Sequence, residues 1–213
     1  MFHAISPIDG RYADKLAALQ TCFSEFALMR ARCQAELYYV LALDKANLFE
    51  PLTNDERARV EDCIHNFNDA DYRRIKAIEH TTKHDVKACE IFLRERVQLR
   101  NENLLHFALT SEDINNLAYN ILLKTYLADF QLPQYRRVLE KLADLAQRWR
   151  DIPFPSRTHG QKATPSTAGK ELAVFINRIL RVYEQLATFK FYGKLNGAVG
   201  NYSAMLSAFP DFD

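Results

Sequence analysis

The sequence predicts an all-α protein, with an N-terminal helical domain followed by the start of a long-helix bundle. Only 6 of its 213 residues are glycine and 7 are proline. No Asn-Gly pair lies between two runs of alternating polar and apolar residues, so β-hairpins are not expected. Long stretches instead place apolar residues three and four apart, which is the spacing of one helix face.

The first domain is predicted to span residues 1–100. After a turn at residues 6–12, one long helix is expected from an apolar stripe at heptad-like spacing. The stripe comprises Leu16, Leu19, Phe23, Phe26, Cys33, Leu37 and Val40. Thr53-Asn54-Asp55-Glu56 has the pattern of a capping box and should open the next helix. A shorter segment then leads to Thr81, and a fourth helix should begin just after His84.

The polar run at residues 100–103 marks a boundary, and residues 101–213 are predicted to form the first part of a central helical bundle. A hydroxyl residue, Thr110 or Ser111, should cap a helix whose first turn carries acids. Pro133 should open another helix. A third is expected from about Pro165 to Tyr192, roughly 40 Å long at 1.5 Å per residue. Rods of this length suit a bundle completed beyond this chain or by other subunits.

Composition argues against several classes of partner. The net charge is +1, from 28 basic and 27 acidic residues, which disfavours nucleic acid or a membrane surface. No apolar run approaches the ~20 residues of a membrane span, and the N-terminus lacks a signal-peptide pattern. The four cysteines show no Cys-x-x-Cys spacing. We expect them to be core thiols of a cytoplasmic protein.

The polar stretch from Ser156 to Ser166 carries the histidine with the most exposed-looking surroundings, His159. Pro153 and Pro155 should end the preceding element. Thr164 is expected as an N-cap and Pro165 as the first residue of a helix. His159 would then lie on a short loop beside a helix N-terminus, where anions are favoured. Two interpretations stay open: a solvated interhelical loop, or a site that holds a carboxylate while His159 transfers a proton.

Other candidate residues lie at predicted helix starts. His84, flanked by Lys83 and Asp85, precedes one helix, and Thr110 and Ser111 precede another. Either position could bind an anion or serve only to cap a helix. Arg11 and Tyr12, after a rigid turn, could contact a phosphate or lie on an ordinary surface. Three anion-receptive helix starts and two acid/base histidines together suit elimination from a multiply anionic substrate.

The remaining histidines are expected to be structural: His3, His65 and His106. His80 and His84 have the spacing of a helical metal pair. The intervening threonines make a helix there doubtful, however, and no third ligand is near. We therefore expect no metal site.

Four blocks resemble the adenylosuccinate lyase family of the fumarase/aspartase superfamily. They are SPIDGRY at 6–12, TTKHDVKA at 81–88, TSEDINN at 110–116 and SRTHGQ at 156–161. By this resemblance the enzyme cleaves a C–N bond by β-elimination in purine nucleotide biosynthesis. Its substrates are adenylosuccinate and the succinyl-carboxamide ribonucleotide (SAICAR), and its products are AMP or AICAR plus fumarate. The family is homotetrameric, with each active site built from three subunits, and uses no metal or organic cofactor.

The resemblance assigns roles to individual residues. His159 matches the general acid that protonates the departing nitrogen. Arg11 and Tyr12 match nucleotide-contacting residues. The second binding block comprises Lys83, His84 and Asp85, and the carboxylate donors are Thr110 and Ser111.

The sequence departs from the family pattern at three places. Lys83 replaces an expected asparagine and Lys162 an expected proline. The third family region, a mobile Ser-Ser-x-Met-Pro loop that supplies the catalytic base, does not occur. We therefore expect this chain to be the N-terminal part of a longer enzyme and to be inactive alone. The alternatives are a sibling lyase of the argininosuccinate type and a non-catalytic helical assembly module.

Overall fold

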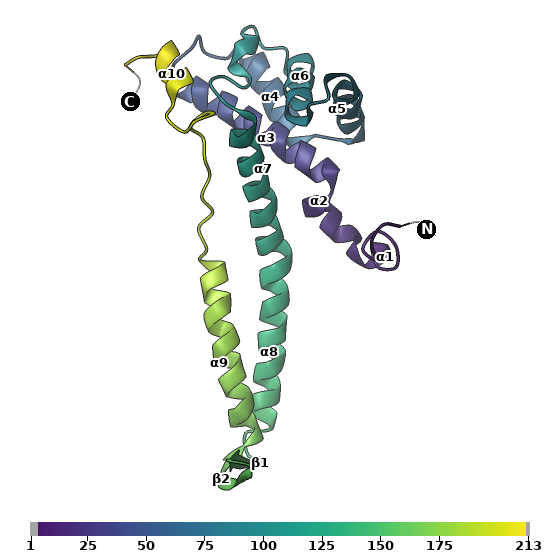
Figure 1. Cartoon of the computed structure of the whole chain (residues 1–213), viewed down its shortest axis with the longest axis vertical. Helices are drawn as coiled ribbons and strands as arrows, with labels where there is room; N and C mark the ends of the chain where they lie inside the picture. Colours follow the sequence, from purple (N-terminus) through teal and green to yellow (C-terminus); the bar gives the residue numbers. More distant parts are fainter. Residues whose placement is uncertain (1–3, 212–213) are drawn as a thin grey trace. The chain divides into compact units, whose positions relative to one another are not determined.

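The computed structural model describes residues 4–211, so His3 lies outside the described residues. The fold is mostly helical, as predicted (Figure 1). It divides into two compact units: the first contains the residues up to Leu123 and those from Tyr192 onward, and the second is Lys124–Phe191. The boundary predicted at residue 100, between an N-terminal domain and a central helical bundle, stays a prediction.

The N-terminal stripe does not form one helix, which corrects our prediction. The segment is divided into α1 (Ala13–Leu16), a 3₁₀ turn (Ala17–Leu19), α2 (Gln20–Phe23) and α3 (Glu25–Lys45). The break is at Ser24, whose backbone is extended and whose Oγ accepts a hydrogen bond from Ala27 N at 3.1 Å. A serine hydroxyl satisfies a free N–H at a helix start, so it favours a new N-cap over continuation of α2.

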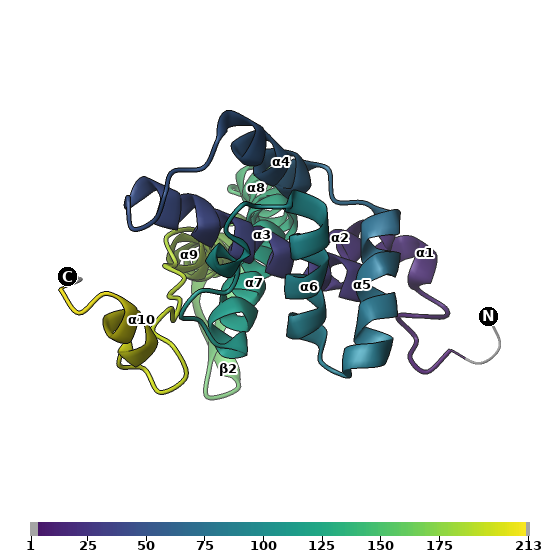
Figure 2. The ribbon, with the colours of Figure 1, turned by 90° about the horizontal axis from the view of Figure 1, so that it is seen from above.

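The core of the first unit lies between α3 and three following helices, α4 (Asn54–His65), α5 (Asp69–Thr82) and α6 (Asp85–Val97) (Figure 2). Each contributes fully buried apolar side chains: Leu37, Val40, Val60, Ile75 and Leu93. The capping box is confirmed, because Thr53 Oγ1 accepts from Glu56 N and Glu56 Oε2 accepts from Thr53 N.

All four cysteines are free and buried, which confirms them as core thiols. Burial raises the pKa of the Cys63 thiol to about 11. A thiol with such a pKa stays protonated at neutral pH and is a poor nucleophile or metal ligand. Their cytoplasmic location stays a prediction.

Glu56 anchors the start of α4 to a distant part of the chain and should make stability depend on pH. Burial alone would raise its pKa, but Arg100 N, the Arg100 side chain and Thr53 hydrogen-bond the carboxylate and lower the pKa to about 2. A lowered folded-state pKa contributes stability above the unfolded value, which is lost as the pH falls through the folded value. Glu56→Gln should therefore lower the free energy of unfolding at pH 7 by about 2 kcal/mol.

The difference between wild type and Glu56→Gln should shrink between pH 4.5 and about 2, when urea unfolding of the 213-residue chain is measured as a function of pH. Glu61→Gln is the matched control, because Glu61 is exposed on the same helix. If Glu56→Gln lowered the free energy of unfolding equally at every pH, the charge of Glu56 would not be what stabilises the start of α4.

The chain then passes a short 3₁₀ helix (Glu102–Leu104) and enters α7 (Ser111–Tyr126). A π-helical segment (Leu127–Gln131) precedes α8 (Leu132–Arg148), which has Pro133 in its first turn. Proline has no N–H and cannot donate to a carbonyl one turn earlier, and near this point the hydrogen bonding changes from the π-helical to the α-helical pattern. The sequence thus placed the start of α8 within one residue.

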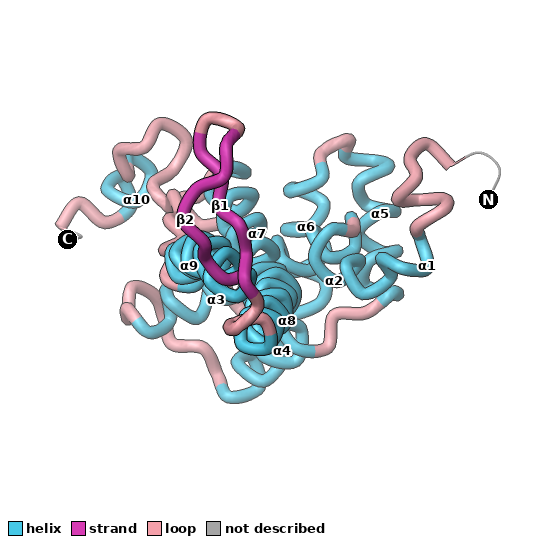
Figure 3. Tube along the Cα trace, turned by 90° about the horizontal axis from the view of Figure 1, so that it is seen from below, coloured by secondary structure: helices cyan, strands magenta, loops and turns pink. Residues whose placement is uncertain are grey.

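In the second unit, α8 and α9 (Ala168–Ala187) pack side by side and are joined by two antiparallel strands, β1 (Pro153–Thr158) and β2 (Gln161–Thr167) (Figures 1 and 3). The predicted interhelical loop is therefore a β-hairpin. Neither Thr164 nor Pro165 begins a helix, because both lie in β2. The N-cap is Thr167, whose Oγ1 accepts from Lys170 N.

The helix expected from Pro165 to Tyr192 is thus shorter, 20 residues or about 30 Å. Its start is fixed against the end of α8 by Ala168 N and Gly169 N, which donate to Ile152 O and Trp149 O. A Cβ on Gly169 would lie 2.3 Å from Ala146 O, so only glycine permits this approach.

Both helices of the second unit leave apolar side chains in solvent. Only Leu139 of α8 and Gly169 of α9 are buried. Large apolar side chains remain exposed on both helices: Val138, Phe175 and Val182, each by half or more. Across the described chain, none of the helices combines the length and apolarity needed to span a membrane.

Candidate functional site

His84 forms the N-cap of α6, as the sequence indicated. Its Nδ1 accepts a hydrogen bond from Lys87 N at 3.2 Å. A neutral imidazole that accepts at Nδ1 carries its proton on Nε2, so His84 can donate Nε2–H to a ligand at the start of the helix. His80 lies in α5, which continues through both threonines to Thr82, so the two histidines do not share a helix face.

Lys83 ends α5 in the left-handed region, with φ 54°. This conformation is costly for lysine and well tolerated by asparagine, the residue that the resemblance led us to expect. Lys83→Asn should therefore raise the free energy of unfolding by about 0.5–1 kcal/mol, as measured by urea unfolding. Lys83→Ala removes the same charge but keeps the unfavourable backbone, so a gain in both variants would contradict this explanation.

Asp85 occupies the first turn of α6, and both of its carboxylate oxygens have partners. Oδ1 accepts from Val86 N at 2.9 Å, and Oδ2 lies 2.7 Å from Arg32 Nη2. Burial raises the pKa of Asp85, but the Arg32 guanidinium and the backbone hydrogen bond from Val86 together more than offset it, and the net pKa is lowered. Asp85 is thus held ionised by the protein itself.

The start of α7 presents two hydroxyl groups, Thr110 and Ser111. Among the described residues neither hydroxyl makes a hydrogen bond, so neither caps α7, which corrects our prediction. Both hydroxyls are left as donors for a ligand. The backbone N of Thr110 donates to Asp113 Oδ2 at 2.8 Å. The hydroxyls and the remaining free N–H groups of this turn are suitable donors for a carboxylate.

Asp113 organises this turn. It is fully buried and accepts hydrogen bonds from Thr110 N, Asn196 N and Gly197 N, while Lys194 Nζ lies 2.6 Å from Oδ1. Burial raises its pKa, and these donors lower it further than burial raises it, so Asp113 remains ionised. The carboxylate thereby ties the TSEDINN block to a segment about 80 residues away.

Asn116 strengthens the same link with a pair of amide hydrogen bonds. Its Oδ1 accepts from Lys194 N at 2.8 Å and its Nδ2 donates to Lys194 O at 2.9 Å. Gly193 permits this approach, because a Cβ there would lie 2.7 Å from Leu117 Cδ2.

His106 precedes this block and, as expected, is part of the scaffold. Its Nδ1 lies 2.6 Å from Oε1 of the fully buried Glu36, which also accepts from His106 N. Burial lowers the pKa of His106, but the carboxylates of Glu36 and Glu90 together more than offset it, and the pKa is raised above its usual value. The pair holds the loop that leads to Thr110.

The second and third blocks lie together in the first unit. Arg32, on α3 and only 3% exposed, contacts Asp85 at the start of α6 and Asn115 Oδ1 on α7, at 2.9 Å from its Nε. Sequence reasoning missed Arg32, Asp113 and Asn115 as site residues. The apolar stripe gave no signal for Arg32, because this residue lies one position before Cys33 and adjacent positions do not share a helix face.

Arg11 and Tyr12 stand in the turn before α1. The Arg11 guanidinium carbon lies 5.4 Å from the centre of the Tyr12 ring, over its face. Within the described residues, no hydrogen bond or ion pair joins either side chain to His84 or Thr110. The described contacts therefore do not connect this block to the other two.

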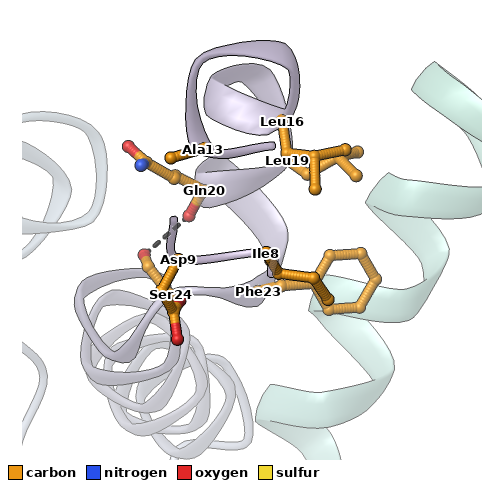
Figure 4. Close-up of a pocket in the computed structure, with 8 residues that line it drawn as sticks. All are labelled: Ile8, Asp9, Ala13, Leu16, Leu19, Gln20, Phe23 and Ser24. Atoms are coloured by element: carbon orange, nitrogen blue, oxygen red, sulfur yellow. Dashed lines mark hydrogen bonds between the residues drawn. The ribbon is translucent and has the colours of Figure 1, made fainter. Parts of the chain in front are cut away.

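A mainly apolar cavity of about 520 Å³ lies beside this turn (Figure 4). The side chains of Leu16, Leu19 and Phe23, which belong to the N-terminal apolar stripe, line it. Phe23 is 57% exposed.

His159 lies at the tip of the β1–β2 hairpin in the second unit. Thr158 pairs with Gln161, so His159 and Gly160 form a two-residue turn, with φ values of 50° and 74°. Positive φ at both positions is the geometry of a type I′ turn, which matches the twist of a hairpin. The His159 ring is exposed, and its Nδ1 lies 3.0 Å from Thr158 Oγ1. The helix start that we expected beside it is absent, because α9 begins eight residues after Gly160.

Comparison with known proteins covers almost the whole chain. A family model described as "Lyase" matches residues 10–212. The chain belongs to this lyase family. It is 46% identical to adenylosuccinate lyase of Escherichia coli and 44% identical to that of Haemophilus influenzae. Each alignment covers 99% of this chain and 48% of the relative. The chain thus spans about half the length of the curated relatives it matches.

Solved structures support the lyase fold independently. A fumarate lyase from Mesorhizobium sp. BNC1 aligns with a TM-score of 0.71 over 90% of this chain and 44% of its own, at 22% identity. A 3-carboxy-cis,cis-muconate lactonizing enzyme from Pseudomonas putida aligns with a TM-score of 0.67 over the same shares, also at 22% identity. Since identity is low, these likenesses concern the fold alone. The predicted family and the predicted fold class are both confirmed.

Proposed function

We propose that this chain is part of a lyase that cleaves adenylosuccinate to AMP and fumarate, and SAICAR to AICAR and fumarate, in purine nucleotide biosynthesis. The observation that carries the proposal is the 44–47% identity to adenylosuccinate lyases over 99% of the chain. The family-specific blocks at residues 6–12 and 81–88 favour this substrate class over the argininosuccinate type.

The proposed chemistry is β-elimination, in which a base removes a proton from carbon and an acid protonates the departing nitrogen. His159 is the proposed acid, since histidine holds and yields a proton near neutrality. Its exposed place at a hairpin tip suits a group that must meet a substrate bound by other elements. A two-stranded hairpin is marginal by itself, which supports a site completed by further parts of the protein.

The other predicted residues bind the substrate in this proposal. Thr110 and Ser111 donate to a succinyl carboxylate, and His84 donates through Nε2. Arg11 and Tyr12 hold the nucleotide, with the guanidinium bound to phosphate. Lys83 and Asp85 contribute charge at the start of α6, where Asp85 is already paired with Arg32. We assign no catalytic role to a metal or organic cofactor.

We further propose a homotetramer with shared active sites. The exposed apolar faces of α8 and α9 support it, because such faces are usually covered by other helices. Light scattering on the natural protein that contains this chain should give the mass of four subunits, and a monomer with full activity would reject shared sites.

The deciding experiment measures fumarate released by that natural protein from adenylosuccinate and from argininosuccinate. Release from adenylosuccinate alone supports the proposal. Release from argininosuccinate alone would identify the sibling lyase. Release from neither would favour a non-catalytic assembly module.

A further inference from the structure

We propose that Arg32 is a positioning residue, whose guanidinium sets the placement of the helix start that carries His84 relative to the one that carries Thr110 and Ser111. The role assigned to these two helix starts rests on the proposed function. In this proposal Arg32 does not contact the substrate. The residue, on α3, is only 3% exposed to solvent.

The contacts of Arg32 join three helices. Nη2 lies 2.7 Å from Asp85 Oδ2, in the first turn of α6. Nε donates to Asn115 Oδ1 at 2.9 Å, one turn after the start of α7. Nη1 faces Met29 Sδ at 3.6 Å, on the turn of α3 before Arg32. The planar guanidinium of Arg32 therefore holds the starts of α6 and α7 against α3.

The joined residues are immediate neighbours of the proposed ligand groups. Asp85 follows His84 directly, and Asn115 lies four residues after Ser111, on the same side of α7. Beneath them, Val86 and Ile114 pack with Ala35 in one small apolar cluster. A shift at Asp85 or Asn115 would therefore move the donors that face the substrate.

The energetics favour geometry over stability as the role of this contact. The Asp85 side chain is 45% exposed, whereas that of Arg32 is 4% exposed. Arg32→Lys would keep a positive charge beside Asp85, so most of the electrostatic contribution of this pair to stability would remain. The guanidinium, however, presents its donors in a rigid fork that an ammonium cannot reproduce. Lysine could neutralise Asp85, but it could not hold Asp85 and Asn115 at their present separation.

Kinetics on the natural protein test the inference. Arg32→Lys should lower kcat/KM by about 10²-fold, mainly through kcat, with a thermal unfolding midpoint close to that of wild type. Asn115→Ala should lower kcat/KM in the same way. The matched control is Arg30→Lys on the same helix, because Arg30 donates to the backbone carbonyl of Thr21 and, among the described residues, forms no ion pair.

A double-mutant cycle separates positioning from general destabilisation. If Arg32 acts through Asn115, the double variant should be no more than a few-fold worse than Arg32→Lys alone. Full additivity, or an Arg32→Lys enzyme within threefold of wild type, would overturn the proposal. The proposal would also be overturned if the variants lost kcat/KM only to the extent that their thermal unfolding midpoints were lowered.

Hydrogen exchange gives a test that does not need turnover. Asn115→Ala should speed amide exchange in the first turn of α6, residues 85–89, and should have little effect there in the Arg32→Lys background. Unchanged exchange at residues 85–89 would overturn the inference. If the wild-type protein released no fumarate, the proposed function would fail, while this measurement would still decide whether Arg32 couples the two helix starts.

Discussion

Replacing His159 with alanine in the natural protein is expected to lower turnover of adenylosuccinate by about 10²- to 10⁴-fold, the usual contribution of a general acid. Substrate should still bind, because its proposed contacts lie at Arg11, at His84 and at the start of α7. The acid acts only once the C–N bond begins to break, so its loss should appear in kcat more than in KM.

The hairpin supplies the control for this experiment. His159 occupies a left-handed position in its turn, so alanine could disturb the turn as well as remove the imidazole. Asparagine is favoured at this position of a type I′ turn, and His159→Asn should therefore be as inactive as His159→Ala. His65→Ala, at an exposed histidine outside the four blocks, should stay fully active. Turnover within a few-fold of wild type in His159→Asn would show that the imidazole is not the acid.

The second large effect concerns the 213-residue chain as it stands, which is expected to release no fumarate from adenylosuccinate. Elimination needs a base at carbon and an acid at nitrogen. The Ser-Ser-x-Met-Pro block that, by the family resemblance, would supply the base does not occur in this sequence. Groups that act as a unit lose most of the rate when one member is missing, so activity in proportion to length is not expected.

The same chain should also fail to remain monomeric. The exposed side chains of α8 and α9 include Val138, Phe175 and Val182, which would gain by burial against a second copy. Fumarate assays and light scattering on the purified chain measure the two expectations separately. Sustained turnover would refute the missing-base argument, and a clean monomer would refute the argument from exposed faces.

Several features that depend on nearby residues were predicted correctly from the sequence, although the helix start expected at Thr164 and Pro165 was not. The capping box at Thr53 and Glu56, the start of α6 after His84 and the start of α8 near Pro133 each follow from side chains within four residues of the position concerned. The four family blocks could likewise be recognised in the sequence, and the comparisons confirmed the family that they indicated. Such signals work because capping and proline geometry are local properties of the backbone.

The hairpin at residues 153–167 was missed, and the reason is also physical. His159-Gly160 is a less common turn pair than Asn-Gly, and the proline-rich strands show no clean alternation, since most of their residues are exposed. The continuous N-terminal helix was wrong for a related reason. Periodicity does not register a single Ser24 whose hydroxyl caps a new helix.

What the sequence by itself determined is therefore the family, the helical class and the identity of the candidate ligand groups. Only the tertiary structure decided how those groups are held. Arg32 meets Asn115 across 83 residues, and Asp113 collects donors that lie 81 to 84 residues away. A buried charge needs partners wherever the fold brings them, and no spacing along the chain reveals which partners those will be.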